Sequence, residues 1–269
     1  MRAPLAAILL LASAASAAHA DPAGWYQGSA GRRRSAHLVA IVAGGALYIS
    51  SETFLKEDLA PSTCRRCGVS SFDGSVRDAA VWEDTGLAAA LSNLDGYFLS
   101  PVVALGLTVL GAPGGVRGPP GRWMDDTIPI VEAGILAGLI NQTVKFAVGR
   151  QRPFVHFADS TRAPGIDDNL SFYSGHTTLA FSIATSAGVV AHRRRSQLEP
   201  LIWSTGYAFA ATTGYLRIAA DRHYFTDVIT GAVAGAAIGL AVPLLLHPHL
   251  GDQIQIVPAG RGIAVLGRF

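Results

Sequence analysis

The sequence predicts an all-α protein: a helical bundle of about six helices, embedded in a membrane, with a small C-terminal hairpin. Hydrophobic residues make up 50% of the chain and charged residues only 15%, against roughly 25% in soluble domains. Six long apolar stretches follow residue 35, and no alternating strand pattern occurs before the C-terminus. The formal net charge of +2 is too small to indicate a nucleic-acid partner.

The first twenty residues have the pattern of a cleaved signal peptide. Arg2 precedes an apolar run that starts at Pro4, and the sequence Ala-His-Ala ends just before Asp21. An uncleaved anchor helix is the alternative, and in either case part of the chain leaves the cytoplasm. We therefore expect four parts: a signal peptide (1–20), an N-terminal segment with the first apolar helix and a cysteine-containing loop (21–95), a helical core (96–249) and a tail (250–269).

The six apolar stretches are expected to form the bundle. Several are apolar all round, as buried or lipid-facing helices are, and recurring Gly and Ala let helix backbones approach closely. The last stretch has nineteen residues without a charge, enough to cross the hydrocarbon core of a bilayer. The tail sequence QIQIVPAGRGIAVLGRF is typical of a small hairpin. The stretches are 37–51, 97–116, 128–148, 175–191, 201–216 and 228–246.

The two cysteines, Cys64 and Cys67, lie in a polar linker as CRRC. A zinc knuckle needs a second pair of ligands, and no Cys or suitably spaced His supplies one. A redox-active pair is expected at the start of a helix in a thioredoxin-like context, which the sequence lacks. In an oxidising compartment, the prediction is a local disulfide that closes the loop.

The first cluster of residues suited to chemistry is KFAVGRQRP. Lys145 and Arg152 are seven residues apart, so two helical turns place both cations on one face, whereas Arg150 lies roughly 140° from Lys145. Pro153 favours an end to the helix at Arg152. Two cations that converge at a helix end suit a phosphate, because Arg offers a planar fork and Lys a point charge. Basic side chains that snorkel at a membrane edge would give the same local pattern.

The second cluster is SFYSGHTTLAFS. Ser174 is a good N-cap, and Gly175 lets a bound group approach the backbone. The free N–H groups of the following helix would point at an anion, and His176 lies beside that site in the first turn. Taken alone, this motif equally describes a capped helix with an incidental histidine.

The third cluster is LRIAADRHYFTD. His223 and Asp227 are four residues apart, so they stack on one face of a helix. Asp227 is then expected to accept the Nδ1 proton of His223, which leaves Nε2 bare as a nucleophile. Arg217 lies six residues before His223, so we expect a bend near AADR to bring it to the same site. A structural His–Asp pair near a membrane surface is the alternative for this cluster alone.

In chain order, the three clusters read K-x6-R-P, S-G-H and R-x5-H-x3-D. This pattern closely resembles the tripartite signature of the type 2 phosphatidic-acid phosphatase and vanadium haloperoxidase superfamily, over about residues 128 to 246. Two positions depart from the common form of the family: Tyr173 stands in place of a Pro, and Leu216 in place of a frequent Ser. Neither position supplies a reacting group, so the departures concern substrate preference more than activity.

The resemblance implies a metal-independent phosphatase without a cofactor, whose active site lies at one end of the bundle. By this likeness His223 would attack phosphorus and form a phosphohistidine, and Asp227 would stabilise the ring as it becomes positive. His176 would protonate the leaving alcohol and then activate the water that releases phosphate. The phosphate oxygens would be held by Lys145, Arg152, Ser174, Gly175 and Arg217. No separate carboxylate-rich cluster in the sequence demands a metal.

The parity of the membrane spans predicts the orientation. The first apolar stretch has only about fifteen uncharged residues, which is short for a span. Five spans after a cleaved leader place the three motifs and the cysteines outside, and the Arg run 193–195 in the cytoplasm, as the positive-inside tendency favours. A soluble secreted bundle is the alternative. Glu132 lies inside an apolar stretch and stays outside the predicted site, since it can equally face a polar interior or pair with an Arg.

The leading hypothesis is therefore a hydrolase of phosphate monoesters or pyrophosphates that acts outside the cytoplasm. Its expected substrate is a phosphorylated lipid, such as phosphatidate or a prenyl pyrophosphate, or a small phosphoester. A vanadate-dependent haloperoxidase would need bound vanadate and is typically a larger protein. A non-catalytic anion- or lipid-binding membrane protein is disfavoured, because every charged residue of the motifs is present.

Overall fold

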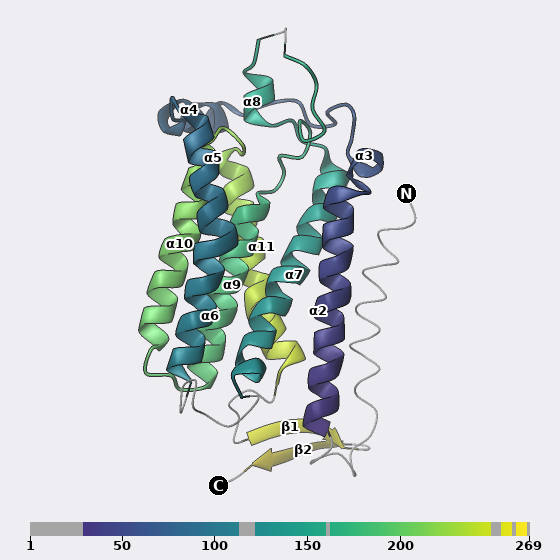
Figure 1. Ribbon diagram of the computed structural model, residues 1–269, viewed down its shortest axis with the longest axis vertical. Coiled ribbons are helices and arrows are strands. Elements are labelled where there is room, and N and C mark those ends of the chain that lie inside the picture. Colours follow the sequence, from purple (N-terminus) through teal and green to yellow (C-terminus); the bar gives the residue numbers. More distant parts are fainter. Residues whose placement is uncertain (1–28, 113–121, 160–161, 249–253, 260–261, 268–269) are drawn as a thin grey trace.

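The computed structural model shows an elongated bundle of long helices that run side by side (Figure 1). The predicted all-α bundle of about six long helices is confirmed, whereas the predicted signal peptide lies outside the described residues. The structure describes residues 29–112, 122–159, 162–248, 254–259 and 262–267. The long helices are α2 (Ser29–Thr53), the continuous rod from α5 (Thr85–Leu94) through the π-helix η2 (Asp95–Leu99) to α6 (Ser100–Gly111), α7 (Arg122–Val148), α9 (Gly175–Arg193), α10 (Glu199–Ala219) and α11 (Phe225–Ala241).

Helix α9 lies at the centre of the bundle and packs against α6, α7, α10 and α11. Its residues from Thr177 to Ala191 are mostly small, and nearly all of them are buried. Three glycines one turn apart on α11 lie against the α9 backbone, where a Cβ on any of them would collide with a carbonyl oxygen. These glycines let the two helices approach closely, as predicted from the composition. They are Gly231, Gly235 and Gly239.

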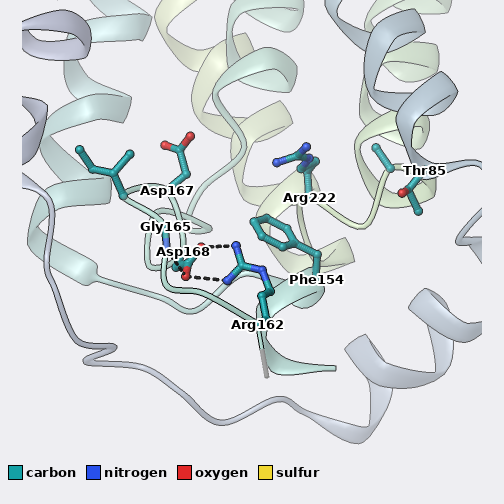
Figure 2. A pocket seen from close by; sticks show the side chains of 9 residues that line it. Thr85, Phe154, Arg162, Gly165, Asp167, Asp168 and Arg222 are labelled. Atoms are coloured by element: carbon teal, nitrogen blue, oxygen red, sulfur yellow. Dashed lines mark hydrogen bonds and ion pairs between the residues drawn. The ribbon is translucent and has the colours of Figure 1, made fainter. Parts of the chain in front are cut away.

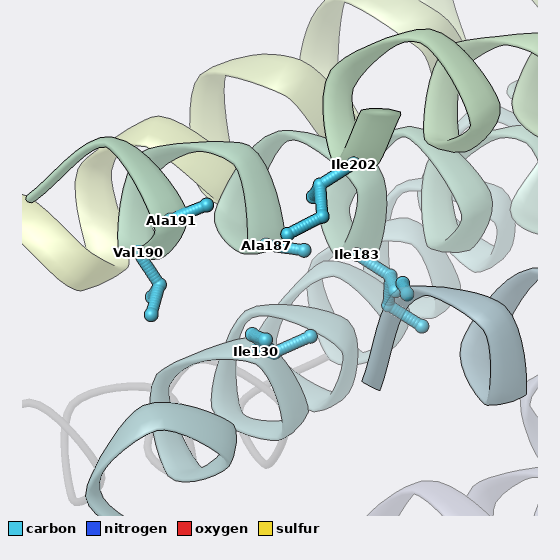
Figure 3. Close-up of a cluster of buried hydrophobic side chains, with 7 residues drawn as sticks. Ile130, Ile183, Ala187, Val190, Ala191 and Ile202 are labelled. Atoms are coloured by element: carbon cyan, nitrogen blue, oxygen red, sulfur yellow. The ribbon is translucent and has the colours of Figure 1, made fainter. Parts of the chain in front are cut away.

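Aliphatic side chains fill the contact between α9 and its neighbours (Figure 3). Ile183 and Val190 of α9 meet Ile130 of α7 and Ile202 of α10, and small alanines fill the space between them. Burying each large aliphatic side chain contributes about 1.5–3 kcal/mol. This core fixes α9, and therefore fixes the loop that precedes it.

The rod from α5 to α6 begins earlier than predicted. The apolar stretch starts at residue 97, but the helix starts at Thr85, because the Asp84 side chain accepts a 2.8 Å hydrogen bond from the Leu87 N–H and caps it. The rod therefore runs through the boundary between residues 95 and 96 that we expected between the N-terminal segment and the core. As a result, Ser92 of α5 contacts Arg217 of α10, and Asn93 of α5 contacts His176 of α9.

Three helices are long and apolar enough to cross a membrane: Thr85–Gly111, Trp123–Val148 and Phe225–Leu246. They support the predicted membrane-embedded bundle. Helices α9 and α10, also expected to cross, run alongside them. Helix α2 begins eight residues before the predicted stretch and packs along α7.

Short helices and loops gather at one end of the bundle: α3 (Lys56–Leu59), α4 (Ser71–Ala80) and α8 (Pro153–His156) (Figure 1). In the loop after α3, a disulfide joins Cys64 to Cys67, with their Cα atoms 5.5 Å apart. The same loop docks on the first motif, since the Arg65 N–H donates to the Gly149 carbonyl at 2.9 Å. At the other end, β1 (Ile254–Ala259) pairs antiparallel with β2 (Gly262–Gly267), which confirms the predicted hairpin.

Candidate active site

The three predicted motifs meet at the end of the bundle that carries the short helices. Helix α7 brings Lys145, the start of α9 brings Ser174 and Gly175, and the turn between α10 and α11 brings His223. A Cβ added to Gly175 would lie 3.3 Å from the Lys145 Nζ, so this ammonium lies directly beside the first turn of α9. The site is deeply buried: Lys145, Arg152 and Arg217 are 9%, 6% and 6% exposed.

Arg152 reaches the site by a different route from the one predicted. Helix α7 ends at Val148 rather than at Arg152, because Gly149 adopts a left-handed conformation with φ +60°. The Arg152 side chain then donates to two backbone carbonyls, from Nε to Asp167 at 2.8 Å and from Nη1 to Arg222 at 3.2 Å. Its position therefore depends on loop carbonyls and not on a shared helical face with Lys145.

The predicted bend near AADR is confirmed, and it brings Arg217 to the site. Helix α10 ends at Ala219, and Asp221 takes a positive φ of 57°. Arg77 of α4 holds this turn through two hydrogen bonds to the Asp221 carboxylate, at 2.6 and 2.8 Å. Arg217 donates to the Ser92 hydroxyl at 3.1 Å, while its buried Nε has no hydrogen-bond partner among the described residues. A buried donor of this kind is suited to an anionic ligand.

His223 and Asp227 lie close together but are not hydrogen-bonded as predicted. The Nδ1 atom of His223 lies 2.7 Å from the backbone carbonyl of Ser171, while the nearest Asp227 oxygen is 3.8 Å away. That oxygen, Oδ2, instead accepts from the Ser171 hydroxyl at 2.5 Å and from the Tyr224 N–H at 3.0 Å. The Ser171 carbonyl therefore fixes the His223 tautomer, with Nδ1 protonated and Nε2 bare.

Arg150, which the helical geometry places away from Lys145, pairs with two carboxylates beside the site. It forms an ion pair with Asp227 at 2.5 Å and another with the buried Asp73 of α4 at 2.8 Å. Asp73 also accepts from the Thr226 N–H at 3.0 Å, at the start of α11. The Oδ1 oxygen of Asp227 is therefore held by Arg150, and Arg150 is held in turn by Asp73. The motif spacing did not predict these contacts.

His176 is oriented by residues of the α5–α6 rod. Its Nε2 lies 2.8 Å from the Asn93 Oδ1, and the Tyr97 ring packs against it with ring centroids 4.2 Å apart. Ser92, Asn93 and Tyr97 lie before the region of the family resemblance, so the motifs did not predict them. The polar run SNLD inside an otherwise apolar helix was the available signal.

Ser174 occupies the predicted N-cap position of α9 but forms no capping hydrogen bond through its side chain. Its hydroxyl pairs with the Thr177 hydroxyl at 2.9 Å, and its N–H donates to the Asp227 carbonyl at 3.1 Å. The first N–H groups of α9 have no partner within the helix, as at any helix start. They lie next to the Lys145 ammonium, which suits an anion.

The electrostatics of the site favour a neutral imidazole at His223. Burial, together with the charges of Arg152, Arg217 and Lys145, holds the pKa of His223 well below its ordinary value. The same set of charges acts on His176. Both histidines therefore lie within the field of all three basic side chains, and we call these five residues the cationic cup.

A cavity of about 450 Å³ adjoins this cup (Figure 2). Asp167 and Arg222, whose backbone carbonyls hold Arg152, both line it. In Figure 2, Arg162 forms a double hydrogen bond with Asp168 at 2.7 and 2.8 Å. Burial opposes ionisation of Asp167, but the hydrogen bond from Lys56 and the charge of Arg152 outweigh it and lower the pKa of this carboxyl.

Comparison with known families agrees with this geometry. Residues 127–249 match the family model of the PAP2 superfamily, and all three motifs lie within the matched region. This match confirms the resemblance to that superfamily predicted from the motifs, over residues 127–249.

Among individual proteins, the lipid A 1-phosphatase of Porphyromonas gingivalis is 34% identical over 105 residues, which cover 39% of this chain. The match spans about a fifth of that relative's length (20%). Two solved structures are also similar. A transmembrane PAP2 type phosphatidylglycerolphosphate phosphatase from Bacillus subtilis has a TM-score of 0.42 at 16% identity, covering 92% of this chain and 98% of its own. LpxE of Aquifex aeolicus has a TM-score of 0.37 at 26% identity, covering 60% and 98%.

Proposed function

We propose that this protein is a membrane-embedded phosphatase that removes phosphate from a phosphorylated lipid through a phosphohistidine intermediate. One observation carries the proposal: three basic side chains and two histidines, from three separate motifs, surround one buried site at the end of an apolar bundle. The family match to residues 127–249 supports the same class of reaction.

In the first half of the reaction, the Nε2 lone pair of neutral His223 attacks phosphorus as the bond to the leaving oxygen breaks. His176 donates a proton to that oxygen, so the alcohol leaves uncharged. The ring of His223 becomes positive, and the Asp227 carboxylate stabilises it across 3.8 Å. In the second half, His176 takes a proton from water, which attacks phosphorus and frees His223.

The basic residues stabilise the charge on the phosphoryl group during transfer. The buried Nε of Arg217 and the ammonium of Lys145 beside Gly175 are positioned to donate to its oxygens. Such donors act most strongly in a buried site, because they need no reorganisation as the charge develops. These cations perform the electrostatic role that metal ions have in other phosphatases.

A lipid substrate suits a site at the end of a bundle with three membrane-length apolar helices. The relative named lipid A 1-phosphatase supports a phosphorylated lipid as the substrate class. The cavity beside Arg152 provides room for a polar part of the headgroup. The disulfide at the same end supports an orientation in which the site faces the oxidising, extracytoplasmic side.

The proposal is tested by phosphate release from phosphatidate, a prenyl pyrophosphate and a small phosphoester, with protein purified in detergent. We expect wild type to release phosphate from at least one lipid, and His223→Ala to release none. The exposed His192→Ala is the matched control and should retain full activity. Equal release by wild type and His223→Ala would remove His223 from its role, and no release by wild type would refute the phosphatase.

The phosphohistidine is tested separately by mixing the enzyme with phosphate-labelled substrate and quenching in alkaline detergent, because phosphohistidine is stable in alkali and hydrolyses in acid. Substitution His176→Ala slows the hydrolysis of the intermediate, so labelled protein should accumulate when the leaving group needs no protonation, as with a nitrophenyl phosphate. The double variant with His223→Ala should carry no label. Label that persists in this double variant would place the covalent bond on another residue.

A further inference from the structure

A second buried polar cluster lies outside the candidate active site and involves the glutamate that the motifs left unassigned. The Oε1 atom of Glu132 lies 2.7 Å from the Nδ1 of His37, and its Oε2 lies 2.6 Å from the Nε2 of His247. The two imidazole rings lie 4.3 Å apart, centroid to centroid. Glu132 is 9% exposed and His247 is 3% exposed, while the His37 side chain is 23% exposed, so the cluster is mostly buried and reaches solvent at His37.

The cluster is distant from the phosphate site. Glu132 and Lys145 are thirteen residues apart on α7, which corresponds to about 20 Å along the helix. His37 lies in the first half of α2, and His247 directly follows the π-helix η4 (Val242–Leu246). These segments lie towards the end of the bundle opposite α8 (Figure 1). The cluster therefore takes no part in the proposed reaction.

The three side chains form a ligand set. Their nitrogen and oxygen atoms all lie within 4.8 Å of one another, and they come from segments far apart in the sequence. Two imidazoles and a carboxylate bind Zn²⁺ at about 2.0–2.2 Å and leave a fourth position open. Tetrahedral ligands at that distance are roughly 3.3 Å apart, so the two nitrogen–oxygen pairs need to open by about 0.6–0.7 Å, and a pair of ligand atoms as far apart as 4.8 Å needs to close by about 1.5 Å.

The apolar surroundings of Glu132 favour a bound cation. An ionised carboxylate inside apolar helices is costly unless positive charge compensates it, and such residues are commonly functional. The two histidines hydrogen-bond to Glu132, and in their neutral form they add no positive charge of their own. A divalent cation supplies that charge and at the same time joins α2, α7 and the chain after η4.

We propose that His37, Glu132 and His247 bind one Zn²⁺ ion, or a similar divalent transition-metal ion, which fastens α2 and the end of the core to α7. The two imidazoles favour Zn²⁺ over Mg²⁺, since Mg²⁺ prefers oxygen ligands. The competing state is a proton shared within the same three side chains.

The test uses full-length protein in detergent, freed of its affinity tag and of metal by dialysis against EDTA. After equilibration with ZnCl₂ and removal of free ion, elemental analysis should find about one zinc per chain in wild type. Zinc should raise the midpoint of thermal unfolding, whereas MgCl₂ should leave it unchanged.

Glu132→Gln and His247→Gln should each lower retained zinc at least tenfold and abolish the thermal shift. The matched control is His192→Gln, which removes the histidine of the exposed 2.9 Å pair with Glu199 and should bind zinc like wild type. Size-exclusion profiles identify any variant that fails to fold, and His37→Gln then replaces it.

The proposal is overturned if wild type retains no zinc, or if folded Glu132→Gln retains as much as wild type. Phosphate release is measured on the same samples only to separate the two proposals. Zinc retention does not depend on phosphatase activity, so one proposal can fail while the other stands.

Discussion

The Asp227 carboxylate is held by several hydrogen bonds, and none of them is the direct bond to His223 that the motif spacing suggests. Arg150 binds one of its oxygens, while Ser171 and the Tyr224 N–H bind the other. The carboxylate therefore positions the start of α11 and acts on His223 through space. We therefore propose that its contribution to activity is electrostatic, while the Ser171 carbonyl sets the tautomer.

Substitution Asp227→Asn should lower kcat by on the order of 10²-fold or more, because it removes the negative charge that stabilises the cationic ring of the intermediate. Ser171→Ala keeps the backbone carbonyl that binds Nδ1, so its loss should be less than about tenfold. Steady-state kinetics measures kcat for both variants and compares each with wild type. The reverse order of effects would show that the Ser171 hydroxyl, and not the charge, is the important group.

The pH dependence of kcat/KM should report the lowered pKa of His223. The proposed reaction needs the neutral ring, so activity should be lost as the pH falls through that pKa, and the acid limb should lie below pH ~6.5, the ordinary value for histidine. Arg152→Gln removes one of the charges that lower the pKa, so its acid limb should move to higher pH. An unchanged limb, whatever the loss of rate, would contradict this electrostatic effect.

Arg222 lines the cavity beside the cup and lies over the Phe154 ring, 4.9 Å from its centroid. No carboxylate pairs with it among the described residues, whereas Arg162 in the same cavity is paired with Asp168. Arg222→Gln should therefore raise KM about 5- to 20-fold for a pyrophosphate, whose second phosphate can reach it, and less for a monophosphate. Arg162→Gln is the control, and an equal effect from both would refute the assignment.

The helices differ in how well the sequence predicts them. The long apolar runs predicted α7, α9, α10 and α11 with small errors, because burial inside a bundle or in lipid requires them. The start of α5 was missed because its first turns are polar and depend on a cap at Asp84. The end of α7 was misplaced because a single left-handed glycine, Gly149, ends it before the proline does.

The catalytic candidates were predictable because the chemistry requires particular residue types at particular spacings. Their supporting residues were not, since a hydrogen bond such as Asn93 to His176 joins positions 83 residues apart. Such partners depend on helix packing, which a single sequence does not show. The same reasoning explains why Asp73 was missed and why Glu132 was left without a partner.

The close contact of α9 and α11 gives a prediction about stability. A Cβ at Gly235 would collide with the Thr178 carbonyl, so Gly235→Ala should push the helices apart and destabilise the protein by about 1–3 kcal/mol. Gly106→Ala on α6 is the matched control, because nothing lies near its Cβ position, and it should be neutral or stabilising. Thermal unfolding in detergent measures both, and equal midpoints would contradict the close packing proposed for Gly235.

Considered as a whole, the bundle has one end with the motifs and the disulfide, and another with the 193–195 Arg run. We predict that the first end faces outward. After mild reduction, a membrane-impermeant maleimide should label Cys64 and Cys67 in intact cells. In a variant without these cysteines, His192→Cys at the opposite end should react only after permeabilisation, and labelling of that site in intact cells would reverse the orientation.

The central position of α9 has a consequence for engineering. Helix α9 packs against α6, α7, α10 and α11 and also presents Gly175 and His176 to the candidate site, so any repacking around it displaces these two residues. Heat-tolerant variants that keep their turnover should therefore accumulate substitutions on the outer surfaces of α2 and α10. Selection for a new substrate should change the loops and leave α9 unchanged.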